Sequence, residues 1–309
     1  MQINKKLPGP DFTLYQLSSE KLPANTFILS SDISRSVLYN PHIAGKVLQD
    51  RMEKMGAIFM SALKATALKG SRLSSTCELV LLSGGLFYSL NYGFKQVYGE
   101  ALPQCFLGIK RSRLEGKEGQ FAAYATYENF ESLPKNATVL IGDTIATGAT
   151  LQKSLQHLFD AVEERHGKIE KLIILTLAGS TVGGERLKEV EKKMQQMFPG
   201  SQLYFIACEQ LFHLMPDGTD LRFLEKDSLM PDETRKYTLA TYGEYLGKEM
   251  KCAVFDWGTR CKNPLAHYHE FLEFCDSMLA QKLDEKSRAV LTKMKKETEE
   301  EIKKMQMQL

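Results

Sequence analysis

One stretch decides the fold of this chain: Val139-Leu140-Ile141-Gly142-Asp143-Thr144-Ile145-Ala146-Thr147-Gly148-Ala149-Thr150. A β-branched apolar run ends in one carboxylate, and a loop of small residues then leads into a Leu-rich segment. This order predicts a buried strand, a tight turn and the start of a helix. The first amides of a helix lack internal partners and lie at the positive end of its dipole, so the turn predicts an anion site. A carboxylate beside such amides suits a ligand with hydroxyls and a phosphate, such as a phosphorylated sugar.

Residues 139–151 resemble the phosphoribosyl-diphosphate (PRPP) motif of the type I phosphoribosyltransferases. In that family an apolar strand leads to two adjacent acids that hold the ribose hydroxyls, and a Thr-Gly-Gly/Ala-Thr/Ser loop holds the 5′-phosphate. The resemblance implies that Asp143 is the second acid and the catalytic residue, and that Gly142 stands where the first acid is usual. It assigns PRPP binding to Thr144, Ala146, Thr147, Gly148, Ala149 and Thr150. The alternative is an ordinary strand–turn–helix corner in which Asp143 and Thr144 only cap the helix.

Composition bounds the class of protein. The chain has 309 residues, 43% hydrophobic and 25% charged, which is typical of a globular protein with one extended domain or two. A net charge of +2 is too small to indicate nucleic-acid binding by the chain as a whole. No run approaches the roughly 20 apolar residues of a membrane span, and the first residues do not resemble a secretory signal. Six cysteines without a C-x-x-C pair indicate reduced thiols, so we expect a cytoplasmic protein.

Apolar runs and helical periodicity alternate along the middle of the chain. Strands are predicted at 79–82, 106–109, 121–127, 138–143, 172–177 and 203–208. Helices are predicted at 86–97, 148–164 and 184–197. This alternation predicts an α/β fold with a mostly parallel sheet, right-handed crossovers and helices on both faces, as in the type I phosphoribosyltransferases. Ligands of such sheets bind beyond the carboxyl ends of the strands.

Four segments follow from this pattern. Residues 1–74 form an N-terminal segment that is irregular over 1–40 and helical over 45–68, and residues 75–210 form the phosphoribosyltransferase-like core. Residues 211–282 are an elaboration or a hood over the acceptor, with a strand at 252–258 and a helix at 264–282. The pattern of residues 283–309 predicts an amphipathic terminal helix that packs either on the body of the protein or at a subunit contact. A homo-oligomer is therefore one possible assembly. The hood could instead be the first 40 residues.

Two further groups of residues are candidate ligands of the diphosphate. Ser83, Gly84 and Gly85 follow the first core strand, where the family carries a loop whose amides bind diphosphate; bare backbone can approach a phosphate closely. Lys110, Arg111 and Arg113 offer charge-assisted hydrogen bonds, and the polar loop 114–120 behind them suggests a mobile cover. The alternatives are a plain strand-to-helix turn and a solvated hairpin.

Ala178 to Leu187 resembles the segment after the PRPP helix of uracil-type members, and is otherwise a Gly-rich loop with Glu185 in the first helical turn. Phe212, Phe223, Phe255 and Trp257 are either stacking surfaces for the acceptor or plain core. No pattern has the spacing of a zinc site, so no dedicated metal site is expected. Mg²⁺ would arrive on the diphosphate of PRPP, because it prefers phosphate oxygens and water.

The resemblance therefore implies transfer of ribose 5-phosphate from PRPP to a nitrogen of a nucleobase or similar heterocycle, with release of diphosphate, in nucleotide metabolism. The first alternative is a non-catalytic module of the same fold that binds PRPP or a nucleotide as a regulator, which Gly142 favours. The second is an unrelated α/β scaffold whose terminal helix mediates assembly.

Overall fold

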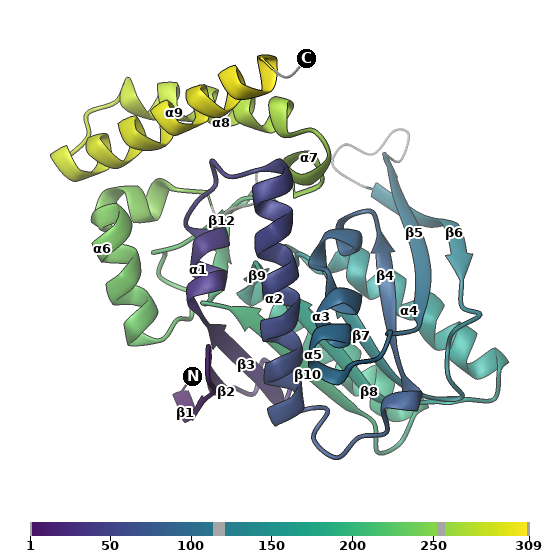
Figure 1. The fold of residues 1–309 in the computed structure, drawn as a ribbon. Helices are drawn as coiled ribbons and strands as arrows, with labels where there is room; N and C mark the ends of the chain where they lie inside the picture. The colour runs from purple at the N-terminus through teal and green to yellow at the C-terminus, as the bar shows by residue number, and fades with distance from the viewer. Residues whose placement is uncertain (1, 114–120, 252–256, 308–309) are drawn as a thin grey trace.

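The computed structural model describes residues 2–113, 121–251 and 257–307, and a nine-stranded sheet forms its centre (Figure 1). Across the sheet the strands are β1 (Gln2–Pro8), β2 (Thr13–Ser18), β3 (Asn25–Ser30), β10 (Gln202–Cys208), β8 (Lys168–Thr176), β7 (Asn136–Gly142), β4 (Thr76–Leu82), β5 (Gln104–Arg113) and β6 (Phe121–Asn129). The six strands from β3 to β5 are parallel, whereas β1, β2 and β6 pair antiparallel at the edges. The predicted α/β fold with a mostly parallel sheet is confirmed, with antiparallel edges added to it.

Helices cover both faces of the sheet because the central strands are apolar on both sides. In β7, Leu140 faces one core, while Val139 and Ile141 face the other. The first core holds α1 (Asp32–Leu38), α2 (Gly45–Ala65) and α3 (Leu90–Tyr98). The second holds α4 (Ala149–Glu164) and α5 (Thr181–Met197). The helices predicted at 45–68, 86–97, 148–164 and 184–197 are thus present, the second as a 3₁₀ turn (Gly84–Tyr88) followed by α3.

The prediction that residues 1–40 are irregular is wrong. These residues form β1, β2, β3 and α1, and β3 joins the main sheet beside β10. Three prolines suggested loops, but Pro8 is the last residue of the edge strand β1, and Pro10 and Pro23 lie between strands. Proline is tolerated at strand ends and edges, where no ladder hydrogen bond is lost.

The described residues after β10 add two strands to β9 (Gly179–Ser180), which gives a small sheet, and form four helices. β11 (Leu211–Leu214) pairs with β9 and with β12 (Leu221–Arg222). The helices are α6 (Asp232–Glu249), α7 (Trp257–Lys262), α8 (Pro264–Leu279) and α9 (Glu285–Gln306). Helices α8 and α9 lie side by side (Figure 1) and bury Phe271, Cys275 and Leu291 in the first core.

The terminal helix therefore packs on the body of the protein, one of its two predicted places. Of the strand predicted at 252–258, residues 252–256 lie outside the described residues, and residues 257–258 begin α7. Within the described part of the chain, no helix has the length and apolar character to cross a membrane.

Candidate functional site

The 143–148 loop joins β7 to α4 at the carboxyl edge of the sheet, and the neighbouring elements hold it firmly. The Ile145 amide donates to the Ala178 carbonyl at 3.0 Å, and the Ser180 amide donates to the Ile145 carbonyl at 2.8 Å. Gly183, at the start of α5, packs so closely on the loop that a Cβ there would lie 2.5 Å from Ile145 Cγ2. Contacts with β9, α5 and the residue before β9 therefore set the loop conformation.

Three consecutive amides of this loop are available to a ligand. Among the described residues, the backbone N–H groups of Ala146, Thr147 and Gly148 have no hydrogen-bond acceptor, and the Ala149 amide reaches only Thr147 Oγ1, at 3.4 Å. Gly148 has φ +73°, which turns the chain into α4 directly after these amides. Successive free N–H groups before a helix N-terminus form an anion-binding concavity.

Asp143 is half-buried at the start of the loop. Its amide donates to the Leu175 carbonyl at 3.1 Å, and its Oδ1 accepts from the Thr144 amide at 2.9 Å. The carboxylate is therefore fixed beside the free amides, on the side of the preceding strand. The N-cap of α4 is Gly148, without a side-chain cap hydrogen bond, so the alternative in which Asp143 and Thr144 only cap the helix is wrong. The carboxylate lies instead next to the predicted anion site.

The Ser83–Gly85 segment lies beside the end of β7. It follows β4 after a cis Leu82–Ser83 peptide bond and opens the 3₁₀ turn. A Cβ built on Gly85 would lie 3.3 Å from the Gly142 carbonyl oxygen, so the two backbones are almost in contact. The structure thus brings together the two predicted phosphate-binding segments.

Tyr88 occupies the position above Gly142. A Cβ on Gly142 would lie 2.5–2.8 Å from Cγ, Cβ and Cδ1 of Tyr88, so no larger residue fits there. The Tyr88 hydroxyl accepts from the Leu177 amide at 3.3 Å and lies 3.3 Å from Thr144 Oγ1. Burial, with a smaller effect of nearby Asp143, raises the pKa of Tyr88, so the phenol stays protonated. The only signal in the sequence was Gly142, since a glycine at a strand end marks close approach.

Two further segments border the 143–148 loop. The Arg186 side chain, from α5, lies against it: its Cδ would be 3.4 Å from a Cβ on Gly148. The Arg186 guanidinium has no hydrogen bond or ion pair to any described residue, so its charge is available to an anion. On another side, a Cβ on Gly218 would lie 3.5 Å from Thr147 Cγ2, which places the β11–β12 turn against the loop.

The basic residues of β5 are only partly described. Lys110 is exposed on the part of β5 beyond Gly108, the last residue that pairs with β4, and it makes no hydrogen bond or ion pair with a described residue. Arg111 and Arg113 pair with Ala123 and Phe121 of β6 through their backbones, and their side chains lie outside the described part. The predicted cover at 114–120 also lies outside it.

Two of the four aromatic residues predicted as possible stacking surfaces lie in the described part of the chain, and both belong to the core. Phe212 and Phe223 are fully buried, and their rings meet edge to face at 5.2 Å in a cluster with Tyr39 and Tyr242. The stacking hypothesis is wrong for both, because a fully buried ring presents no face to a ligand. Phe255 and the Trp257 side chain lie outside the described residues.

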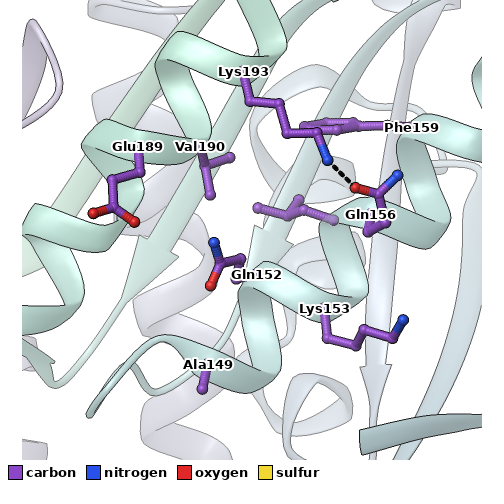
Figure 2. A pocket seen from close by; sticks show the side chains of 9 residues that line it. Ala149, Gln152, Lys153, Gln156, Phe159, Glu189, Val190 and Lys193 are labelled. Atoms are coloured by element: carbon purple, nitrogen blue, oxygen red, sulfur yellow. Dashed lines mark hydrogen bonds between the residues drawn. The ribbon is translucent and has the colours of Figure 1, made fainter.

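A cavity of about 320 Å³ starts at Ala149, but it opens between α4 and α5 (Figure 2). Its rim carries Lys153 and Lys193, with Lys193 donating to Gln156, and its lining includes no residue of the Ser83–Gly85 segment. It is therefore separate from the site at the sheet edge. Within residues 2–113, 121–251 and 257–307, no cluster of three or more His, Cys, Asp or Glu could hold a metal ion.

No family model and no curated protein matches the chain. Among solved structures, adenine phosphoribosyl transferase from Trypanosoma brucei, in complex with AMP, pyrophosphate and ribose-5-phosphate, is 17% identical, with TM-score 0.36 over 62% of this chain and 87% of that one. Hypoxanthine phosphoribosyltransferase from Trypanosoma cruzi, complexed with IMP, is 14% identical, with TM-score 0.29 over 61% and 91%. The Staphylococcus aureus hypoxanthine enzyme is 18% identical, with TM-score 0.27 over 40% and 64%. The TM-scores are too low for these structures to indicate an activity for this chain. The geometry of the chain itself is the basis for its proposed activity.

Proposed function

We propose that this chain binds PRPP at the carboxyl edge between β4 and β7 and transfers its ribose 5-phosphate to a nitrogen of a nucleobase or similar heterocycle, releasing diphosphate. The observation that carries the proposal is the row of free amides at Ala146, Thr147 and Gly148, flanked by Asp143 and the Ser83–Gly85 segment. An anion site next to a carboxylate and a second glycine-rich turn matches a ligand with a phosphate at one end, hydroxyls in the middle and a diphosphate at the other.

Each group has a role in this proposal. The free amides and the Arg186 guanidinium hold the 5′-phosphate, and Asp143 orients the ribose through its hydroxyls. The amides of Gly84 and Gly85, with Lys110, Arg111 and Arg113, hold the diphosphate. The bond from the anomeric carbon to the diphosphate oxygen breaks, a bond to the incoming nitrogen forms, and the proton of that nitrogen passes to a base. Most of the acceleration comes from positioning and electrostatic stabilisation of the leaving group.

Mg²⁺ would enter on the diphosphate. A half-buried carboxylate and the hydroxyl of Thr144 are hard oxygen donors that suit this ion, while most of its ligands would be phosphate oxygens and water. When bound, it neutralises charge that develops on the leaving diphosphate.

A second candidate function is binding of PRPP, or of a nucleotide, without turnover. The observation that favours it is the Tyr88 ring over Gly142, which excludes any carboxylate at the first acid position of the motif. A lone acid holds the ribose less tightly and balances less positive charge at the reacting carbon.

The test is calorimetric titration with PRPP and Mg²⁺, together with a diphosphate-release assay over a panel of purine and pyrimidine bases. We expect binding by the wild type and diphosphate release with at least one base. Asp143→Asn should reduce turnover by about 100-fold or more, with the unfolding midpoint unchanged. The control is Glu163→Gln, which removes an exposed carboxylate from α4. Binding without turnover would support the second candidate, and absence of PRPP binding would contradict both.

A further inference from the structure

We infer that Lys262, the last residue of α7, is a ligand for the diphosphate, so that the chain beyond the parallel core completes the site. This inference rests on the proposed function. Its starting point is a contact over 179 residues of sequence: the Lys262 ammonium donates to the Ser83 hydroxyl, directly before the paired glycines. Helix α7 lies against the 3₁₀ turn that these glycines open.

The position of α7 is fixed by Arg260, which lies in the same helix two residues before Lys262. The Arg260 side chain is fully buried, and its guanidinium donates to the carbonyls of Ile43 at 2.6 Å, Asn40 at 2.7 Å and Val37 at 3.3 Å. These carbonyls belong to the end of α1 and the turn into α2, so α7 is tied to the body of the protein. Arg260 thus fixes the helical turn from which the exposed Lys262 side chain reaches Ser83.

The charge environment favours an anionic partner. Among the described residues, Lys262 has no carboxylate within ion-pair distance, and its hydrogen-bond partner is a neutral hydroxyl. The Ser83–Gly85 segment itself supplies backbone amides and no charge. An ammonium beside the Ser83 hydroxyl, at the start of a glycine-rich turn, suits a diphosphate, whose oxygens take strong, short hydrogen bonds from cations.

The experiment titrates three probes into the full chain: Mg²⁺-diphosphate, PRPP and ribose 5-phosphate. Lys262→Gln should weaken the binding of diphosphate and of PRPP by about 10-fold and leave ribose 5-phosphate unchanged. Lys262→Arg, which keeps the charge, should retain most of the affinity. The matched control Lys282→Gln changes an exposed lysine of the α8–α9 turn and should bind all three probes like the wild type.

Unchanged diphosphate affinity in Lys262→Gln would overturn the inference, and a higher affinity would show that Lys262 blocks the site. An equal loss for ribose 5-phosphate would also overturn it, because the effect would then be structural. If the wild type and Lys262→Gln bind PRPP equally well, the role of Lys262 is rejected and the proposed function still stands. A wild type that binds neither PRPP nor diphosphate rejects the proposed function itself.

Discussion

The two loops that meet at the sheet edge are supported in different ways. The 143–148 loop is held by segments of the same core, β9 and α5, through backbone hydrogen bonds and a close glycine contact. The Ser83–Gly85 segment is flanked by the Gly142 carbonyl and by Lys262, which comes from the far end of the chain. One half of the site is therefore held by backbone contacts within the core, whereas the other half is in addition reached by a lysine of α7.

The largest expected effect comes from restoring the missing acid where the two loops touch. Gly142→Asp places a Cβ within 2.5–2.8 Å of the Cβ and ring atoms of Tyr88 and buries a carboxylate, so we expect a loss of at least about 3 kcal/mol in the free energy of unfolding. Urea denaturation measures this loss. In a Tyr88→Gly background the same substitution should cost clearly less, because the Cβ and the ring that it meets are both gone. Equal costs in both backgrounds would mean that Tyr88 does not exclude the acid.

The opposite end of β4 provides a test remote from both loops. Burial raises the pKa of Glu78 to about 7 from 4.5, despite a hydrogen bond from Gln104 that lowers it. Because the folded-state pKa is raised, this contribution to stability is complete below pH 4.5 and is lost as the pH rises through 7. The loss is on the order of 3 kcal/mol.

Urea denaturation at pH 5 and pH 8 measures this slope, and Glu78→Gln should flatten it. Affinity for PRPP should be unchanged in the variant, since Glu78 lies at the amino end of its strand. A slope of the opposite sign, or a change in affinity, would contradict this assignment.

The smallest effect is expected from a substitution in the 143–148 loop, which should change the binding of phosphate but not that of diphosphate. Gly148→Ala puts a side chain at φ +73°, which costs about 1 kcal/mol and disturbs the amides of the 143–148 loop. Ribose 5-phosphate should then bind more weakly, with diphosphate affinity unchanged, which is the reverse of Lys262→Gln.

Gly70→Ala is the matched control for this variant. It has φ +70° with nothing within 4 Å of the added Cβ, so it should cost similar stability and leave both affinities intact. Weaker diphosphate binding in Gly148→Ala would show that the two halves are not independent.

The sequence predicts the local elements of the site better than the contacts between distant residues. The strand predicted at 138–143 and the helix at 148–164 correspond to β7 and α4 within about two residues, because local periodicity encodes them. The strands of residues 1–40 escape a prediction from local pattern because Pro8, Pro10 and Pro23 indicate loops, whereas here they end or separate strands. The contact of Tyr88 with Gly142, and that of Lys262 with Ser83, join residues far apart in the chain. Gly142 indicates a close approach, but no local pattern identifies the partner in either contact.

The parallel pairing of β3 with β10 has a consequence for biosynthesis. Asn25, in β3, donates to the Leu203 carbonyl across 178 residues of sequence, so β3 emerges from the ribosome long before its neighbour exists. At ordinary translation rates the delay is roughly 10–35 s. During that interval β2 can shield one edge of β3, and the other edge stays exposed to nascent-chain partners and chaperones.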